Sequence, residues 1–285
     1  MGKIKLDSDR PNKPWAVAGI VGTTVNGLRV QRTLGRGSFG TVYKVLRQAD
    51  SERYALKTID TKSMSHRGRQ AAVNEISLLA SVNNSYVLQF FEAFVHGELL
   101  CIVTEFAPCG DLAKRLAQLQ LSETLLPESV VWSYFIQLCL GLNALHSVNI
   151  VHRDLKPANV LLISNHHLKI GDLGISKVLT ASDGTAKTQC GTPAYFSPEL
   201  WRRQPYNCKT DVWSLGVLLY EMMALRLPFK QAKNVLWGAF PQVLAGEGHP
   251  YSALLGESQA TLCLLVRNCL RATGVPSTSC VLSVR

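Results

Sequence analysis

The spacing of apolar and polar residues changes about one third of the way along the chain. Residues 28–106 contain short stretches rich in Val, Leu, Tyr and Phe, a pattern that predicts strands. One helix is predicted within this part, at about residues 68–82, where apolar side chains recur on one face: Ala72, Ile76 and Leu79.

Beyond Gly110 the apolar residues follow a helical spacing. The pattern predicts helices over residues 111–121, 128–147, 210–224 and 258–271. A strand-rich part followed by a helix-rich part predicts an α+β fold with two lobes. No internal repeat or low-complexity linker separates the two parts. We therefore expect the lobes to be two halves of one catalytic unit.

One apolar segment is long enough to cross a bilayer. Residues 129–151 contain no Asp, Glu, Lys or Arg. Polar residues interrupt the segment, however, and a helix that is apolar nearly all round also suits the centre of a large soluble domain. We therefore expect a buried core helix and no membrane span.

Composition narrows the classes of function only slightly. Hydrophobic residues make up 47% of the chain and charged residues 18%, which argues against a disordered or fibrous protein. The net charge of +10 invites a nucleic-acid site, but the basic residues are scattered, with one dense group at residues 62–69. We favour a basic surface suited to acidic substrates or surfaces, and expect no nucleic-acid partner.

The eight cysteines form no CxxC pair and no short regular spacing. They indicate neither a zinc site nor a disulfide framework, and a reducing cytosolic or nuclear compartment fits best.

A glycine-rich run precedes a strand-like segment near the start of the strand-rich part. A dinucleotide-binding turn has the same G-x-G-x-x-G spacing but needs a helix to begin within the glycines, whereas residues 41–45 alternate as a strand does. This favours a hairpin whose backbone N–H groups approach phosphate oxygens, with an ordinary Gly-rich hairpin as the alternative. The residues of the run are Leu34, Gly35, Arg36, Gly37, Ser38, Phe39, Gly40, Thr41 and Val42.

Four further motifs follow in order. The segment Tyr54-Ala55-Leu56-Lys57 reads as a strand that ends in a lysine, and Glu75 on the predicted helix is a candidate partner for it. The alternative for Glu75 is a solvated helix carboxylate. The other motifs are H-R-D-L-K-P-A-N at residues 152–159, G-D-L-G at 171–174, and G-T-P-A-Y-F-S-P-E at 191–199.

Together, and in this order, these motifs resemble the protein kinases over residues 28–271. D-V-W-S-L-G at residues 211–216 is similar to the kinase helix whose aspartate braces the catalytic loop. The Lys-Ile-Gly-Asp, Ser-Pro-Glu and Pro-Phe stretches are similar to the NIMA-related serine/threonine kinases. The chain is identified as a member of that family.

The resemblance implies a role for each matching residue. Asp154 would be the catalytic base, and Lys156 would neutralise the transferring phosphoryl group. Lys57, paired with Glu75, would hold the α- and β-phosphates of ATP, and the backbone from Glu105 to Ala107 would meet the adenine. Mg²⁺ would be held by Asn159 and Asp172.

The family resemblance also implies a reaction, partners and places in the cell. The reaction would transfer the γ-phosphate of ATP to Ser or Thr hydroxyls of proteins. A pseudokinase, which binds partners through the same fold without turnover, is the alternative. The expected location is the cytoplasm, with nuclear, centrosomal or ciliary roles suggested by association alone. The oligomeric state is not indicated.

The predicted domain is flanked by two unlike segments. Residues 1–27 read as a flexible lead, and the domain divides into lobes at about 28–106 and 107–271. Residues 272–285 lack the Asp-Pro…Arg-Pro turn in which kinases supply an arginine to the glutamate that is Glu199 here. This tail is typical of an alternative splice end or a shifted reading frame. A buried Glu199 without its arginine would destabilise the fold.

Thr188 is the candidate site of activating phosphorylation. It precedes Thr192, whose hydroxyl we expect to contact the catalytic loop through Asp154 and Lys156. A phosphate on Thr188 would give Arg153 a counter-charge and order the segment. The alternative is that Thr188 is one exposed hydroxyl among several in this segment.

Overall fold

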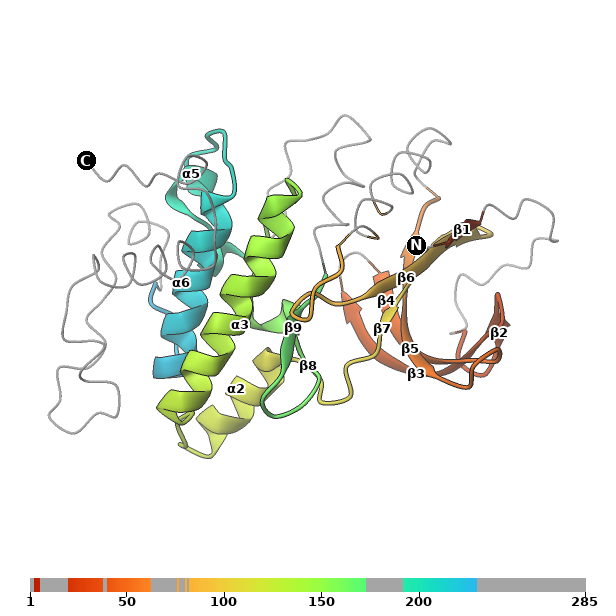
Figure 1. Ribbon diagram of the computed structural model, residues 1–285, viewed down its shortest axis with the longest axis horizontal. Coiled ribbons are helices and arrows are strands. Elements are labelled where there is room, and N and C mark those ends of the chain that lie inside the picture. Colours follow the sequence, from red (N-terminus) through yellow and green to blue (C-terminus); the bar gives the residue numbers. More distant parts are fainter. Residues whose placement is uncertain are drawn as a thin grey trace, which may run out of the picture. The chain divides into compact units, whose positions relative to one another are not determined.

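The computed structural model describes residues 3–5, 20–37, 40–62, 76, 80, 82–172 and 192–229 (Figure 1). These residues belong to two compact units. The first takes in residues up to 83 together with 88–107, and the second takes in 84–87, 108–172 and 192–229.

The first unit is built on one sheet, coloured red to yellow in Figure 1. Its strands lie in the order β1-β6-β7-β5-β4-β3-β2. All neighbouring strands are antiparallel except β1, which pairs in parallel with β6. The strands are β1 (Lys3–Lys5), β2 (Thr24–Val25), β3 (Leu28–Gly37), β4 (Gly40–Arg47), β5 (Arg53–Asp60), β6 (Phe90–His96) and β7 (Leu99–Glu105).

Alternation along the central strands builds the core of this unit. Val45 on β4 and Leu56 on β5 are fully buried, and the residues on either side of each are less buried. These side chains pack in one cluster with Leu28, Val30, Phe94, Cys101 and Val103. The predicted strand-rich lobe is confirmed.

The sequence pattern missed the two short strands before Leu28. β2 is joined to β3 by Asn26 and Gly27, which both have positive φ (47° and 77°), as an Asn-Gly hairpin turn requires. Val25 is buried in the same cluster as Leu28. A two-residue strand is too short to show alternation, so only the Asn-Gly pair could have indicated it.

The second unit is mainly helical. Its helices are α2 (Leu112–Leu121), α3 (Glu128–Ser147), the short α5 (Pro198–Trp201) and α6 (Lys209–Ala224). The three longer described helices agree with the predicted bounds to within about a residue, and the short α5 was not predicted. A two-stranded hairpin of β8 (Val160–Leu162) and β9 (Leu168–Ile170) and two 3-10 turns, η1 (Pro157–Asn159) and η2 (Pro193–Tyr195), complete it. The predicted helix at 258–271 lies outside the described residues, as does most of the one at 68–82. The α+β class is confirmed.

Helix α3 is the buried core helix that its composition predicts. Phe135, Leu138 and Leu142 are fully buried on it. Its one glycine allows a close approach, because a Cβ at Gly141 would lie 2.8 Å from the carbonyl oxygen of Tyr86. Among the described residues, no helix is both long and apolar enough to cross a membrane.

Candidate functional site

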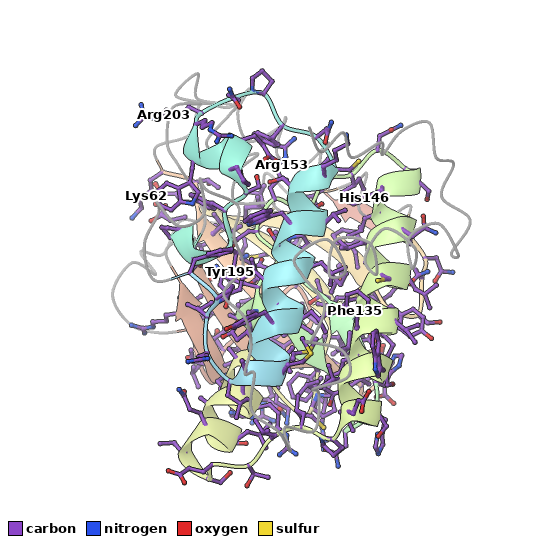
Figure 2. The ribbon with its side chains drawn as sticks, turned by 90° about the vertical axis from the view of Figure 1, so that its left-hand side faces the viewer. Lys62, Phe135, His146, Arg153, Tyr195 and Arg203 are labelled. Atoms are coloured by element: carbon purple, nitrogen blue, oxygen red, sulfur yellow. The ribbon has the colours of Figure 1, made fainter. Side chains whose placement is uncertain are left out.

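A buried carboxylate on α6 holds the loop that carries the H-R-D motif. Asp211 Oδ2 accepts a hydrogen bond from the backbone N–H of His152 at 2.8 Å, and Oδ1 accepts one from Arg153 at 2.8 Å. His146, from the end of α3, adds a contact of 2.8 Å between its Nε2 and Asp211 Oδ2. Figure 2 shows His146 and Arg153 near the start of α6. The predicted bracing aspartate is therefore confirmed in place.

This bracing supports a strained backbone. Arg153 has a φ of 68° and Asp172 a φ of 54°. Both values lie in the left-handed region of backbone conformation, which residues other than glycine rarely adopt. Such conformations persist when the surroundings fix them, and they gather at functional sites. Asp211 fixes the first of the two through its bond to the Arg153 N–H.

His152 links the catalytic loop to the G-D-L-G segment. Its ring is fully buried, with Nε2 2.9 Å from the carbonyl oxygen of Gly171. Since a carbonyl only accepts, Nε2 carries the proton and Nδ1 is free to accept from the Asp154 N–H at 3.3 Å. One imidazole thus fixes the backbone on both sides of the loop.

Asp154 lies at the centre of a set of donors. Its Oδ2 accepts from Lys156 Nζ at 2.9 Å and from Asn159 Nδ2 at 3.2 Å, and its Oδ1 accepts from the Thr192 N–H at 3.3 Å. Lys156 Nζ also donates to Thr192 Oγ1 at 2.9 Å. The structure brings the predicted base and the predicted phosphoryl-neutralising lysine together. The Thr192 hydroxyl contacts Lys156 as expected, whereas Thr192 contacts Asp154 through its backbone N–H and not its hydroxyl.

The residues expected to hold Mg²⁺ fit that role in their chemistry. Asn159 Nδ2 donates to the carbonyl oxygen of Asp154 at 2.8 Å, so the loop is contacted by the amide nitrogen of Asn159. The Asn159 carbonyl accepts from the Gly171 N–H at 2.8 Å, one residue before Asp172. Amide and carboxylate oxygens are the protein ligands that Mg²⁺ prefers.

In the first unit, the glycine-rich run forms the end of the β3–β4 hairpin. Gly35 pairs with Val42, Arg36 with Thr41 and Gly37 with Gly40; Leu34 lies at a register shift, and Ser38 and Phe39 are outside the described residues. Gly40 has a φ of 141°, and a Cβ there would lie 2.0 Å from the carbonyl oxygen of Thr58. A strand follows the glycines, so the hairpin interpretation holds over the dinucleotide turn.

Lys57 lies on β5, between Val42 of β4 and Ile102 of β7. It shares a sheet with the glycine-rich hairpin, as expected. Its predicted partner Glu75 lies outside the described residues. Glu105 ends β7 and Ala107 lies two residues further on; the Glu105 N–H donates to the Gln89 carbonyl at 2.9 Å.

Beside Lys156 and Thr192 the second unit has a pocket of about 420 Å³. Leu116, Ala158 and Leu225 give it an apolar lining. One carboxylate among the described lining residues, Glu221 on α6, accepts a short hydrogen bond of 2.5 Å from Tyr195 Oη. Burial raises the pKa of Glu221, and the bond from Tyr195 opposes part of the rise.

Sequence reasoning overlooked two of these residues. His146 is one of the polar residues within the apolar segment 129–151, and its place six residues before the H-R-D motif was the available signal. Glu221 gave no signal, because only folding places it beside Tyr195.

Glu199 differs from its prediction. Its side chain is half-buried and not fully buried, since it lies in the single turn of α5. Among the described residues it forms no ion pair, and the tail expected to lack its arginine, like Thr188, lies outside them. The loss of stability expected from the tail stays a prediction, because the tail lies outside the described residues.

Comparison with known proteins agrees with this geometry. The family model of the protein kinase domain matches residues 28–271. Mouse serine/threonine-protein kinase Nek3 is 39% identical over 79% of the chain and 43% of its own length. Mouse Nek4 is 41% identical over 81% of the chain and 29% of its own length. A putative serine/threonine-protein kinase A of Trypanosoma brucei brucei is 40% identical over 81% of the chain and 55% of its own length.

The matched region thus spans between 29% and 55% of the length of these relatives. The residues matched by the family model contain all the motifs described above, from Gly35 to Gly216. This chain belongs to the protein kinase family, and its relatives place it among the NIMA-related serine/threonine kinases.

Proposed function

We propose that this chain transfers the γ-phosphate of ATP to serine and threonine hydroxyls of proteins, with Asp154 as the base. The observation that carries the proposal is the fixed carboxylate of Asp154, held by Lys156, Asn159 and Thr192. A carboxylate fixed in this way has little freedom to lose when it accepts the proton of a substrate hydroxyl.

Lys156 is suited to stabilise charge on the transferring group. An ammonium has three N–H donors, and Asp154 and Thr192 take two of those on Lys156. The third is available for a phosphoryl oxygen. Because a preorganised cation needs no rearrangement as charge develops, this arrangement favours phosphoryl transfer.

The residues proposed for ATP and Mg²⁺ are those of the matching kinase motifs. The glycine-rich hairpin and Lys57 would bind the phosphates, and the backbone near Glu105 and Ala107 would bind the adenine. Asn159 and Asp172 would hold Mg²⁺, which when bound neutralises charge on the phosphates. The pocket between Leu116, Lys156 and Leu225 would receive the chain of the substrate around its hydroxyl.

Thr188 is the proposed site of activating phosphorylation. A phosphate there would be a counter-charge for Arg153, whose guanidinium lies 5.4 Å above the ring of Tyr206. The test is phosphopeptide mapping of the active chain, together with rates for Thr188→Ala and for Thr185→Ala as its neighbouring control. Full activity of Thr188→Ala would move the switch elsewhere.

The catalytic proposal is tested with purified chain, ATP, Mg²⁺ and casein, followed by analysis of which amino acids carry phosphate. We expect phosphoserine and phosphothreonine from the parent chain. Asp154→Asn should lower turnover by about 10²-fold or more and leave nucleotide affinity nearly unchanged. Asp60→Asn, the same change at an exposed carboxylate on β5, is the matched control.

Two results would contradict the proposal. Equal turnover by Asp154→Asn and the parent would remove Asp154 as the base. Nucleotide binding by the parent without phosphate transfer, under conditions in which mouse Nek3 is active, would favour the scaffold alternative.

A further inference from the structure

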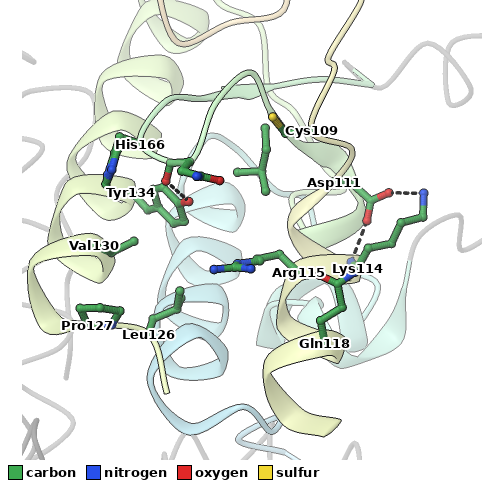
Figure 3. Close-up of a pocket in the computed structure, with 12 residues that line it drawn as sticks. Cys109, Asp111, Lys114, Arg115, Gln118, Leu126, Pro127, Val130, Tyr134 and His166 are labelled. Atoms are coloured by element: carbon green, nitrogen blue, oxygen red, sulfur yellow. Dashed lines mark hydrogen bonds and ion pairs between the residues drawn. The ribbon is translucent and has the colours of Figure 1, made fainter. Parts of the chain in front are cut away.

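The second unit carries another pocket on a different side of α2. Figure 3 shows it between α2, the start of α3 and the turn that joins β8 to β9. Its volume is about 420 Å³. Lys114, Arg115 and Gln118 of α2 line it, whereas Leu116 and Gln120 of α2 line the pocket beside Lys156. The two pockets share no described lining residue.

The wall formed by the β8–β9 turn is fixed to α3 by hydrogen bonds. Tyr134 Oη donates to the carbonyl oxygen of Asn165 at 2.6 Å. Gln137 Nε2 donates to the carbonyl oxygen of His166 at 2.8 Å, and Gln137 Oε1 accepts from the Leu168 N–H at 2.9 Å. A buried glutamine that spans the turn in this way makes the wall preformed.

The wall formed by α2 is fixed to β8. The Leu162 N–H donates to the Gly110 carbonyl at 2.8 Å, and the Cys109 N–H donates to the Leu162 carbonyl at 3.1 Å. Asp111 caps α2 by accepting from the Lys114 N–H at 2.9 Å. Binding in this pocket therefore requires little ordering of the protein, which favours affinity.

The pocket has an excess of positive charge. Asp111 is its one carboxylate among the described lining residues, and it is engaged in capping α2 and in an ion pair of 2.8 Å with Lys114. Apart from its backbone, whose N–H donates to the Asp111 carbonyl, Arg115 has no hydrogen bond or ion pair to a described residue, and Figure 3 shows its side chain reaching from α2 into the space in front of α3.

The electrostatics of Tyr134 agree with this placement of Arg115. Burial raises the pKa of the Tyr134 hydroxyl, and the positive charge of Arg115 opposes part of the rise. The guanidinium thus acts on the interior of the pocket and not only on its rim.

The base of the pocket is apolar. Leu126, Leu162 and Tyr134 are almost fully buried, and Val130 is half-buried beside them. The sides are open, because Arg115, Lys114 and other polar lining residues are exposed. A small metabolite is usually enclosed on most of its surface. An open pocket with an apolar base and a cationic rim instead suits one side chain of a longer segment.

We propose that this pocket docks an acidic peptide segment of a partner protein, with one apolar side chain on the base and carboxylates next to Arg115. The proposal rests on charge complementarity between that rim and the segment. Because α2 also lines the pocket beside Lys156, a docked partner would lie on the same helix that borders the proposed substrate pocket. The docking itself requires no phosphoryl transfer.

The test is fluorescence polarisation with a labelled nine-residue peptide, Glu-Asp-Glu-Leu-Glu-Glu-Leu-Asp-Glu. This probe has no hydroxyl that a kinase could phosphorylate, so the result is independent of the proposed catalysis, and Asp154→Asn should bind it as the parent does. We expect Arg115→Glu to weaken binding about ten-fold, because an attraction becomes a repulsion. Val130→Asp, at the base, should weaken it by a similar factor.

Both substitutions preserve the fold by design. Arg115 is exposed, and both positions lie in the first turn of their helices, where a carboxylate is favourable. Arg29→Glu is the matched control, since it makes the same charge change at an exposed site on β3. It should change affinity by less than about two-fold.

Three outcomes would overturn the proposal. The first is no binding of the probe at low salt. The second is equal weakening by Arg29→Glu and Arg115→Glu, which would mean non-specific attraction to a basic chain. The third is equal affinity for a probe with both leucines replaced by glycine, which would make the pocket a site for anions and not a docking site.

Discussion

Lys156 and Asp154 form an ion pair of 2.9 Å in which both side chains are about four-fifths buried. The same ammonium donates to Thr192 at 2.9 Å. One cation therefore links the carboxylate of the catalytic loop to the segment that contains the Gly-Thr-Pro motif.

Replacement of Lys156 should impair chemistry more than folding. We expect Lys156→Met to lower kcat by about 10²-fold or more, because a preorganised cation is lost beside the transferring group. Its thermal midpoint should change little, since the aliphatic stem is retained. Kinase assays and thermal melts on the same preparation measure both. A large loss of stability at normal kcat would make Lys156 structural.

Thr192 should act through Lys156. Thr192→Val keeps the backbone N–H that donates to Asp154 but removes the hydroxyl that Lys156 contacts. We expect kcat to fall about ten-fold, less than for Lys156→Met. Thr124→Val, the same change at an exposed threonine before α3, is the control. If Thr192→Val and the control gave the same rate, the hydroxyl would have no positioning role.

Asp211→Asn should destabilise the second unit. The amide has one acceptor where the carboxylate serves His152, Arg153 and His146, so buried donors lose their partner. We expect the free energy of unfolding to fall by about 1.5–3 kcal/mol. Urea unfolding measures it, with Asp60→Asn as the exposed control. A loss no larger than that of the control would show that the loop does not depend on Asp211.

The pH dependence of stability offers a second test of Asp211. Burial alone raises its pKa, but the bonds and charges of His146, His152 and Arg153 outweigh burial, so the pKa lies below its ordinary value. Such a carboxyl contributes stability above its unfolded pKa of about 3.9, and the contribution is lost as pH falls through the folded-state value. The parent should therefore lose stability below about pH 4 more steeply than Asp211→Asn.

The sequence predicted the helices and the motif residues, which depend on the pattern of neighbouring residues. Apolar spacing located α2, α3 and α6, and Asp111 lies at the cap of α2, just before its first helical residue. The motif at residues 152–159 singled out Asp154, Lys156 and Asn159 through its resemblance to the kinase catalytic loop.

Several strand pairings and side-chain contacts between residues far apart in the sequence were not predicted. Strand β1 has three residues and is fixed by pairing with β6, nearly ninety residues away. His146 meets Asp211 across 65 residues, and Tyr195 meets Glu221 across 26. The docking pocket is likewise assembled from α2, α3 and the β8–β9 turn, none of which has a recognisable motif at its lining positions.

Two glycines of the hairpin should have different roles: Gly40 should be needed for stability, and Gly35 for nucleotide binding. Gly40→Ala places a Cβ 2.0 Å from the Thr58 carbonyl at a φ of 141°, so we expect a loss of about 2–4 kcal/mol. Gly35→Ala meets nothing within 4 Å, so its stability should stay within about 0.5 kcal/mol of the parent.

Nucleotide binding distinguishes the two variants further. Gly35→Ala should weaken the binding of a non-hydrolysable ATP analogue several-fold without unfolding the chain, because the added methyl keeps phosphates from the backbone. Thermal melts and titration calorimetry give both quantities. Unchanged affinity in Gly35→Ala would mean that the hairpin glycines serve the fold alone.

Glu221→Gln should have two effects that can be measured separately, one on the stability of the chain and one on its choice of substrate. Burial raises the pKa of Glu221 above the unfolded value of about 4.3, so the folded chain binds more protons than the unfolded chain between the two values. Stability therefore falls as pH rises through that window, and the cost persists at pH 7. The glutamine is neutral and still accepts from Tyr195, so Glu221→Gln should be as stable as the parent at pH 7.5, or more so. The parent should regain stability relative to Glu221→Gln as pH falls through that window.

The same substitution should alter the choice of substrate. Glu221 is the one carboxylate among the described residues of the pocket beside Lys156, and its loss removes the attraction for a basic side chain of a bound peptide. We expect kcat/KM for an arginine-containing peptide to fall several-fold relative to a peptide with leucine at that position. Tyr195→Phe, which leaves Glu221 without its donor, should lower stability at pH 7.5 by about 1–3 kcal/mol. If Glu221→Gln were less stable than the parent at pH 7.5 and kept the same ratio of kcat/KM values, Glu221 would be a structural carboxylate with no part in selecting substrates.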